Sequence, residues 1–448
     1  FEEPNTLVQL ASGNRTEPNL KATQVELVDG LEARAVNCWP SARFDLMAVV
    51  QWFKAFMPSG FYYKTFIWPT WHWYEWAIRG AAGLGKSPVE TDPDRYDKRH
   101  ANTDLLVIGA GRSGIDAAIA AAEQGRRVLL LDDQDQPGGA ALHEGGDWLA
   151  ARLKHARSLP TLEILSRCQA FGYYDHNHVV AVQSLATQGL RQRLWHIRAQ
   201  EVVLATGAIE RPLIFPNNDR PGVMLASGAR RYLNRYGVVA GRNVVVATNN
   251  DSAYATALEL AAAGVKVLAV LDSREAPSGP SIDAAKRAGI RIEASCAPTN
   301  TRGSSCLLGV EWHRVDAAGK AVPGTAAELD CDALLVAGGW NPTVHLFSQS
   351  GGGLRFDERL QSFVPERSVQ RERSVGAAAG DFGEDYAQQA LRPIDVTTLG
   401  RKSNYSWVDL ASDVTEGDLR LAARENFAAV EHLKRYTTTG MMTDQGKT

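Results

Sequence analysis

The sequence predicts an α/β fold built on two strand–helix–strand units, and three features carry this prediction. The stretch from Asp104 to Gly139 reads as an apolar strand, a glycine turn, an alanine-rich helix and a second strand that stops at Asp132. Residues 242–272 repeat strand, helix and strand without the glycines. Two later apolar runs, 201–207 and 331–339, each read as a buried strand that enters a glycine turn.

The glycine turn of the first unit has the spacing of a dinucleotide-binding fingerprint, GAGRSG. Gly109 permits the tight turn, Gly111 lets the backbone approach a pyrophosphate, and Gly114 lets the helix pack close to the strand. The helix N-terminus presents free N–H groups and a partial positive charge to the phosphates. Asp132 ends the second strand, where an acid accepts hydrogen bonds from an adenosine ribose. A glycine-rich packing turn is the alternative, and the complete pattern favours a nucleotide.

Further segments extend this predicted pocket. The pair Gly138-Gly139 follows the ribose acid and lets a loop close over the nucleotide. A strand expected over 162–171 brings the backbone near Ala170 to the adenine end of the site. The small residues Thr206-Gly207 fit against a bound nucleotide.

A third contact is predicted from the small-residue run 374–382, which ends in Gly380, Asp381 and Phe382. A run of this kind that ends in Gly-Asp is usual in FAD-type domains, where it returns a glycine turn to the pyrophosphate. A long helix normally follows, whereas here only a short one is expected over 383–391.

The second unit has the strands and the helix but a different turn, TNNDSA, from Thr248 to Ala253. The three glycines are absent. The bulkier side chains and the charge of Asp251 oppose a pyrophosphate that approaches the backbone. We therefore expect a Rossmann-like domain that holds no nucleotide.

The fold class predicted is thus α/β, of the two-dinucleotide-binding flavoprotein type, with a Rossmann-type first unit and a degenerate second unit. Proteins of this type place FAD in the first unit and NAD(P)H in the second. If the second unit binds no nucleotide, two alternatives remain for the first unit. It holds either FAD that is reduced by another donor or the only nicotinamide nucleotide.

Composition excludes several function classes. The net charge of −3 gives no electrostatic case for nucleic acid or an anionic membrane. No apolar run reaches the roughly 18 residues of a membrane span. The chain starts at Phe1 without a charged and then apolar leader, so no signal peptide is expected.

The metal and thiol chemistry expected of the chain is sparse. None of the five cysteines forms a CxxC pair, which argues against a redox disulfide, an iron–sulfur cluster or a structural zinc. Free thiols in a reducing cytoplasm are expected instead. His72 and Glu75 supply too few ligands for a metal. The ten histidines are scattered and read as structural, so no catalytic residue is predicted.

Four regions are predicted along the chain. An aromatic-rich N-terminal region contains a dense stretch from Phe53 to Trp76, either a packed subcore or a subunit interface, and a charged linker over 90–104 follows it. Near the C-terminus, Thr415 caps a helix whose apolar face extends to Leu433. The predicted boundaries are 1–98 for the aromatic-rich region, 99–215 with 330–390 for the dinucleotide-binding domain, 216–329 for the degenerate domain, and 391–448 for a linker and helix.

Several strings outside the nucleotide units resemble one family. They are EEPNTLVQL, ATQVEL, VNCWPSARFDLMAV, GFYYKTFIWP, GGWNPTVHLFSQSGG and KRYTTTGMMTDQGKT. Together they resemble the alpha subunit of bacterial heterotetrameric sarcosine oxidase, over nearly the whole chain. The strings are much more specific than the glycine fingerprint, which many folds share.

The resemblance implies an oxidoreductase complex that demethylates sarcosine with O2, giving glycine, hydrogen peroxide, and formaldehyde or 5,10-methylene-tetrahydrofolate. It implies beta, gamma and delta partner subunits, with FAD and FMN in or shared with beta, and NAD in the alpha subunit. An N-terminal ferredoxin-like segment and a C-terminal tetrahydrofolate-binding domain are expected in the family. This chain therefore looks like an internal fragment, inactive alone.

The resemblance also assigns site residues at matching positions. Arg112 departs from the small residue usual in the turn and should point away from the phosphates. The implied NAD contacts are Gly109, Gly111, Ser113 and Gly114 at the pyrophosphate, Asp132 and Asp133 at the ribose, Gly138 and Gly139 in the loop, Ala170 at adenine, and the turn of Ala377, Gly380, Asp381 and Phe382. Thr206 and Gly207 are added from the residue pattern alone.

Two other readings stay open. One is an autonomous FAD-dependent oxidoreductase, or a subunit of a related opine, proline or cyanide-forming dehydrogenase, although such relatives usually add cysteines for iron–sulfur clusters. The other is a scaffold with an empty pocket, which the intact fingerprint and Asp132 disfavour.

Overall fold

The computed structural model describes residues 7–441 apart from 13–14, 23–24, 26, 37, 42, 50–65, 67, 82, 145–146, 188–189, 384–385 and 402–404. The chain forms two compact units, Asp94–Arg401 and a second made of Phe1–Pro93 with Lys402–Thr448. The first of these contains both strand–helix–strand repeats. No helix in the described part of the chain is long and apolar enough to cross a membrane.

The first repeat forms a seven-stranded sheet in the order β8-β7-β6-β11-β10-β9, with β24 paired to β11. Strands β8, β7, β6 and β11 are parallel, whereas β9, β10 and β11 form an antiparallel meander. The elements are β6 (Tyr96–Ile108), α3 (Arg112–Glu123), β7 (Val128–Leu131), η3 (Gly139–His143), α4 (Trp148–Ser158), β8 (Leu162–Leu165), β9 (Cys168–Tyr174), β10 (His178–Thr187), β11 (Leu190–Leu204) and β24 (Glu372–Ser374).

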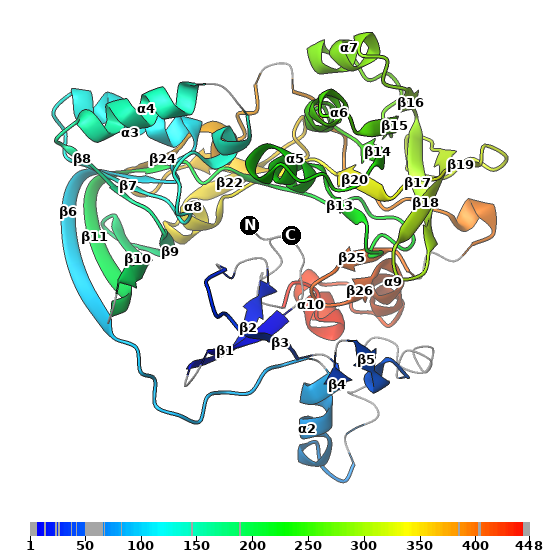
Figure 1. Cartoon of the computed structure of the whole chain (residues 1–448), viewed down its shortest axis with the longest axis horizontal. Coiled ribbons are helices and arrows are strands. Elements are labelled where there is room, and N and C mark those ends of the chain that lie inside the picture. Colours follow the sequence, from blue (N-terminus) through cyan, green and yellow to red (C-terminus); the bar gives the residue numbers. More distant parts are fainter. Residues whose placement is uncertain are drawn as a thin grey trace. The chain divides into compact units, whose positions relative to one another are not determined.

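Both faces of this sheet are buried, as the apolar runs predict. Leu105 and Val107 pack with helix α3 in one core, and α3 and α4 lie together on that side in Figure 1. Leu106 and Ile108 point to the opposite core, which Phe347 of α8 (His345–Gln349) joins. The strand alternation therefore fixes the end of β6, and with it the position of the glycine turn.

The second part of the charged stretch, from Tyr96, is a strand and not the linker that its composition predicts, whereas residues 90–95 lie in no helix or strand. β6 begins at Tyr96, and its first half pairs with the first half of β11. Charges on this exposed part are satisfied across the pair, since Arg193 Nε lies 2.8 Å from Asp97 Oδ1. Opposite charges stabilise neighbouring strands, so a stretch rich in charge can pair in a sheet.

The second repeat forms a five-stranded parallel sheet in the order β13-β20-β14-β15-β16. Helices α5, α6 and α7 pack on one face, and β17 and β18 cover the other. The elements are β13 (Val223–Leu225), α5 (Ala226–Tyr236), β14 (Asn243–Thr248), α6 (Ser252–Ala262), β15 (Lys266–Asp272), α7 (Pro280–Arg287), β16 (Ile292–Ala294), β17 (Cys296–Gly303), β18 (Leu307–Arg314), β19 (Ala327–Leu329) and β20 (Ala333–Ala337).

Short antiparallel strands connect the two sheets. β12 (Ala208–Glu210) leaves the first sheet after β11 and pairs with β21 (Trp340–Pro342), which follows β20. Both predicted strand-to-glycine-turn runs, at 201–207 and 331–339, therefore lead into this crossing. The remaining elements are the hairpin of β22 (Gly353–Asp357) and β23 (Ser362–Arg367) and the turns η4 (Gly376–Ala379) and η5 (Thr397–Leu399).

The other unit contains the capped helix near the C-terminus. Thr415 and Asp418 bond reciprocally as a capping box, which confirms the predicted N-cap. The apolar face expected on one helix is divided between two, since Asn426 adopts a φ of 71° between them. The elements are β1 (Leu7–Ser12), β2 (Arg15–Lys21), β3 (Ala33–Ala35), β4 (Pro40–Ser41), β5 (Phe44–Asp45), α2 (His72–Ala81), β25 (Trp407–Asp409), β26 (Val414–Thr415), α9 (Glu416–Arg424) and α10 (Val430–Thr437).

Most of the aromatic stretch from Phe53 to Trp76 lies outside the described residues. In the part that is described, Trp68, Trp73 and Trp76 are exposed. Within the described part of this unit, these three side chains therefore do not form a packed subcore.

Candidate nucleotide-binding site

The turn between β6 and α3 needs the first and last glycines of the fingerprint for its own packing. Gly109 has a φ of +100°, and a Cβ on it would overlap the carbonyl oxygen of Ala205. A Cβ on Gly114 would overlap the carbonyl oxygen of Gly109. Only a residue without a side chain fits either position. These two glycines hold strand, helix and turn together, whether or not a ligand is bound.

Gly111 is different, because a Cβ placed on it would meet no other atom within 4 Å. Its φ of −74° and ψ of −175° suit any residue, so backbone strain does not require a glycine either. Gly111 is the N-cap of α3, whose first N–H groups have no acceptor inside the helix. Open space beside unused N–H groups is what a pyrophosphate requires. The turn therefore fits a dinucleotide.

Asp132 lies at the end of β7, directly beside the turn. Its carboxylate accepts hydrogen bonds from the backbone N–H groups of Ala110, at 2.6 Å, and Gln134, at 2.9 Å. Burial raises the pKa of Asp132 to about 6, although the two backbone hydrogen bonds lower it; the nearby charge of Asp133 raises it slightly further. A ribose hydroxyl that donates to this carboxylate would favour its ionised form.

We expect Asp132 to make the nucleotide-free chain less stable as the pH rises from about 4 to about 6. Asp132 binds its proton more tightly in the folded chain than in the unfolded chain. The stability that this difference contributes is therefore fully present below the pKa of the unfolded chain. Raising the pH through the folded pKa removes about 3 kcal/mol, at 1.36 kcal/mol per pKa unit. Relative to Asp132→Asn, whose side chain does not titrate, the parent chain should lose about that much free energy of unfolding over this range. An unchanged profile would show that Asp132 titrates normally.

The loop that follows Asp132 lies against the turn. A Cβ on Gly139 would come 3.0 Å from the Cα of Gly111, so the two backbones are in contact. Arg112 lies with its guanidinium over the Trp148 ring and 2.7 Å from the carboxylate of Glu144. Its side chain is thus held by the chain itself, as expected for a residue that does not bind the phosphates.

The run 374–382 returns to the glycine turn. Val375 N donates to the carbonyl of Leu204 at 2.9 Å, which extends the pairing of β24 with β11. A Cβ on Gly376 would overlap the hydroxyl of Ser113, so η4 lies directly on the first turn of α3. The turn brings Ala377 into the same region, and it ends at Gly380 in the left-handed conformation.

The residues after Gly380 differ from the short helix that the sequence predicts. Asp381 N donates to the carbonyl of Gly376 at 3.1 Å, and Phe382 lies against Tyr386 with ring centroids 5.1 Å apart. The described residues 383 and 386–391 form no helix.

The other predicted contacts lie on neighbouring strands. Cys168 N donates to the carbonyl of Asp132 at 2.7 Å, which joins the start of β9, the strand of Ala170, to the ribose acid. The predicted strand 162–171 is in fact two strands, because Arg167 adopts a φ of 52° between them. The side chain of Asp133 is exposed.

Thr206 and Gly207 lie where the chain leaves the first sheet. The Thr206 hydroxyl donates to the carbonyl of Thr343 at 2.8 Å, and Thr343 N donates to the carbonyl of Gly207 at 2.9 Å. Gly207 has a φ of +71° and open space where a Cβ would lie. These two residues are therefore fixed by the strand crossing beside the pocket.

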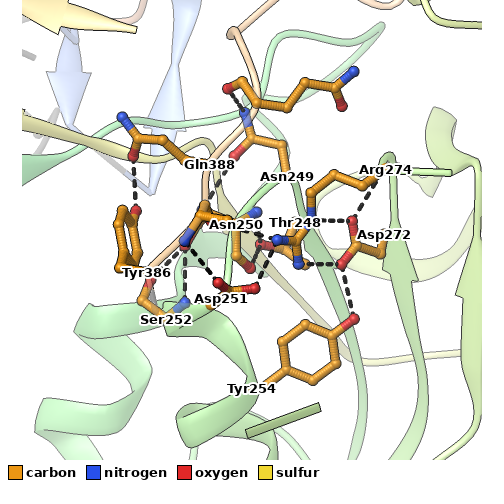
Figure 2. Close-up of polar contacts among 12 residues, drawn as sticks. Thr248, Asn249, Asn250, Asp251, Ser252, Tyr254, Asp272, Arg274, Tyr386 and Gln388 are labelled. Carbon is orange, nitrogen blue, oxygen red and sulfur yellow. Dashed lines mark hydrogen bonds and ion pairs between the residues drawn. The ribbon is translucent and has the colours of Figure 1, made fainter. Parts of the chain in front are cut away.

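The matching turn of the second unit is filled by its own side chains (Figure 2). Asp251 is the N-cap of α6, the place that Gly111 holds in the first unit, and its carboxylate lies 2.6 Å from Arg274 Nη1. Tyr254, at the place of the third glycine, is fully buried and donates to Asp272 at 2.8 Å. Asp272, at the place of the ribose acid, is fully buried and bound by Arg274. An incoming pyrophosphate would meet a carboxylate at the N-terminus of α6.

The described residues offer little redox or metal chemistry of their own. They contain no group of three or more His, Cys, Asp or Glu side chains placed to hold a metal ion. Burial raises the pKa of both Cys168 and Cys331 to about 12, so these thiols are not ionised at neutral pH. What the site can do is bind and orient a nucleotide.

Fold and site together define an α/β protein of the two-dinucleotide-binding flavoprotein class in which one site is open. In agreement, a family model described as FAD dependent oxidoreductase matches residues 104–201. The structure is similar to the crystal structure of L-proline dehydrogenase from P. horikoshii, with a TM-score of 0.57 and 20% identity over 80% of this chain and 74% of that one. The FAD-dependent family supports a flavin cofactor in proteins of this class.

More specific matches lie outside the nucleotide units as well. The model of the sarcosine oxidase A3 domain matches residues 403–448. Sarcosine oxidase subunit alpha of Rhizobium meliloti (strain 1021) is 39% identical over 493 residues, which cover 99% of this chain and 49% of that protein. The subunit alpha of Corynebacterium sp. (strain P-1) is 39% identical over 82% of this chain and 43% of that protein.

The chain belongs to the family of sarcosine oxidase alpha subunits, as its strings outside the nucleotide units predict. It spans about half the length of these curated relatives.

Proposed function

We propose that this chain is the NAD-binding part of a sarcosine-oxidising complex. The first unit would hold NAD through the turn at Gly111, with the ribose at Asp132 and Asp133 and the adenine near Ala170. The loop at Gly138 would close on the pyrophosphate from one side, and the turn of Ala377, Gly380, Asp381 and Phe382 from the other. The chain would contribute binding and orientation and no catalytic acid, base or nucleophile.

One observation carries this proposal: of the two matching turns, only the first has open space at the helix N-cap. Gly111 leaves that space free, whereas Asp251 fills it with a carboxylate. A protein of this class with two open sites would hold FAD and NAD(P)H together. The single open site supports one bound nucleotide in this chain. Because members of the family are named as subunits, we place the redox chemistry in other subunits of the complex.

The reaction of the whole complex would be a two-electron oxidation of sarcosine. The substrate loses a hydride equivalent and a proton to give an imine, and water then releases glycine and formaldehyde. O2 takes up the two electrons and two protons as hydrogen peroxide. Flavins in or shared with a beta subunit supply the hydride acceptor when bound. Gamma and delta subunits, transfer of the one-carbon unit to tetrahydrofolate, and a cytoplasmic location belong to the same proposal.

The test is to identify the nucleotide that the chain carries. The protein is purified without added nucleotide, denatured in acid, and the released small molecules are separated by chromatography and read by absorbance. NAD without a flavin band is the expected result. FAD in the first unit would overturn the NAD assignment and favour an autonomous flavoenzyme. If the chain carries no nucleotide and does not bind added NAD, the result would favour the alternative of a scaffold with an empty pocket.

A further inference from the structure

Residues 386–391, which we call the strap, lie across the glycine-free turn of the second unit (Figure 2). The backbones of Asp251 and Asn249 each bond to it, through Asp251 N to Ala387 O at 3.2 Å and Gln389 N to Asn249 O at 2.9 Å. The Asp251 carboxylate also accepts the Ala387 N–H at 2.8 Å. A segment of the same chain therefore lies against the turn that would bind a nucleotide in the second unit.

A buried ion cluster fixes the inner side of this contact. Arg274 donates to both oxygens of Asp272, at 3.0 and 2.7 Å, and to Asp251 at 2.6 Å. Burial alone would lower the pKa of Arg274, but its hydrogen bonds and charge pairing with Asp272 and Asp251 raise it above the usual range. The side chain of Asp251 is thus held in one orientation, with its second oxygen directed at the strap.

The other end of the strap leads to the first unit. Tyr386 donates to Gln388 at 2.7 Å and lies against Phe382. Phe382 follows Asp381, whose N–H closes the turn on Gly376. Because Gly376 lies on Ser113 of the glycine turn, a continuous series of contacts joins the turn of the second unit to the third contact of the first.

We propose that Asp251 and Arg274 are positioning residues for the nucleotide of the first unit and act through the strap. This inference rests on the proposed function. A turn as short as η4, followed by coil, loses conformational entropy when a ligand orders it. Because the strap is already anchored by Asp251, part of this entropy is lost before the ligand binds, and binding costs less free energy. In place of a second nucleotide, the second unit then supplies a fixed support for the first site.

The experiment compares Asp251→Ala, Asp251→Asn and Glu259→Ala in the full chain. Glu259, whose side chain is more exposed than that of Asp251, forms an ion pair with Arg230 between α5 and α6, away from the strap, and serves as the control. The bound nucleotide is removed, and the dissociation constant for NAD is measured by calorimetry. Hydrogen exchange of the peptide that contains 386–391 is followed with and without NAD.

We expect Asp251→Ala to weaken NAD binding by about two- to thirtyfold, the range of long-range couplings of 0.5–2 kcal/mol. Glu259→Ala should leave binding unchanged. Asp251→Asn should restore most of the affinity, because an amide oxygen can accept the Ala387 N–H. In the parent chain NAD should slow hydrogen exchange in the strap, since coupling is reciprocal, and Asp251→Ala should abolish this protection.

Equal affinity in the parent chain and Asp251→Ala, or an equal loss in Glu259→Ala, would overturn the inference and leave the proposed function intact. A parent chain that binds no NAD would instead overturn the proposed function, and this inference with it.

Discussion

Valine in place of Gly111 should leave the chain folded and remove its nucleotide. The backbone of Gly111 is unstrained and no atom lies where the new side chain begins, so the folded chain can accept it. The same space is where the pyrophosphate has to approach the N-terminus of α3. Losing two hydrogen bonds to a charged group costs about 3 kcal/mol, which is roughly a hundredfold in affinity.

The measurement pairs nucleotide content after purification with the free energy of unfolding of the nucleotide-free chain. Gly80→Val is the control, because Gly80 also has open space at its Cβ position and lies in the other unit. Both variants should unfold within about 1 kcal/mol of the parent chain, as substitutions away from packed sites do. Nucleotide retained at the parent level in Gly111→Val would refute the assignment of this turn as the pyrophosphate site.

The first nucleotide unit could be predicted from sequence because its signals are local. Strand β7 coincides with the predicted run from Val128 to Leu131, and α3 follows its glycine turn directly. Gly114 reports a steric condition set within the turn, because a Cβ on it would overlap the carbonyl oxygen of Gly109, whereas Gly111 leaves open space. The exception is Gly109, whose close neighbour Ala205 comes from a distant strand.

The first half of β6 could not be predicted in the same way. Residues 96–103 carry charges of both signs and no apolar alternation, so their composition indicates a linker. Their pairing with β11 depends on partners far along the chain, such as Arg193 with Asp97. Cross-strand pairs of this kind become visible only when the register is known.

The strap escaped prediction for a related reason. Its hydrogen bonds to Asn249 and Asp251 are made by its own backbone groups, and Ala387 is 136 residues from Asp251. The sequence does show that Asp251 opposes a phosphate, which is why the second unit is predicted to be degenerate. It does not show what replaces the nucleotide, because an alanine or a glutamine in a coil gives no signal of the carboxylate it meets.

The second unit keeps its fold without a ligand because its own charges are paired, and removing the pairing cation should be costly. Arg274→Met would leave the fully buried Asp272 and the mostly buried Asp251 without their guanidinium. Breaking a buried ion pair by removing one partner costs about 3–5 kcal/mol, because the remaining charge is uncompensated. We expect a loss of that size in the free energy of unfolding, measured by urea denaturation followed by circular dichroism.

Two further variants separate charge from packing. The double variant Arg274→Met with Asp272→Asn should recover part of the loss, since it removes the fully buried uncompensated charge together with its partner. Arg355→Met breaks the ion pair with Asp357, in which the arginine is half exposed, and should cost only about 0–1 kcal/mol. If Arg274→Met cost no more than Arg355→Met, the cluster would not stabilise the second unit. The strap would then lack the rigid support from which its role in nucleotide binding is inferred.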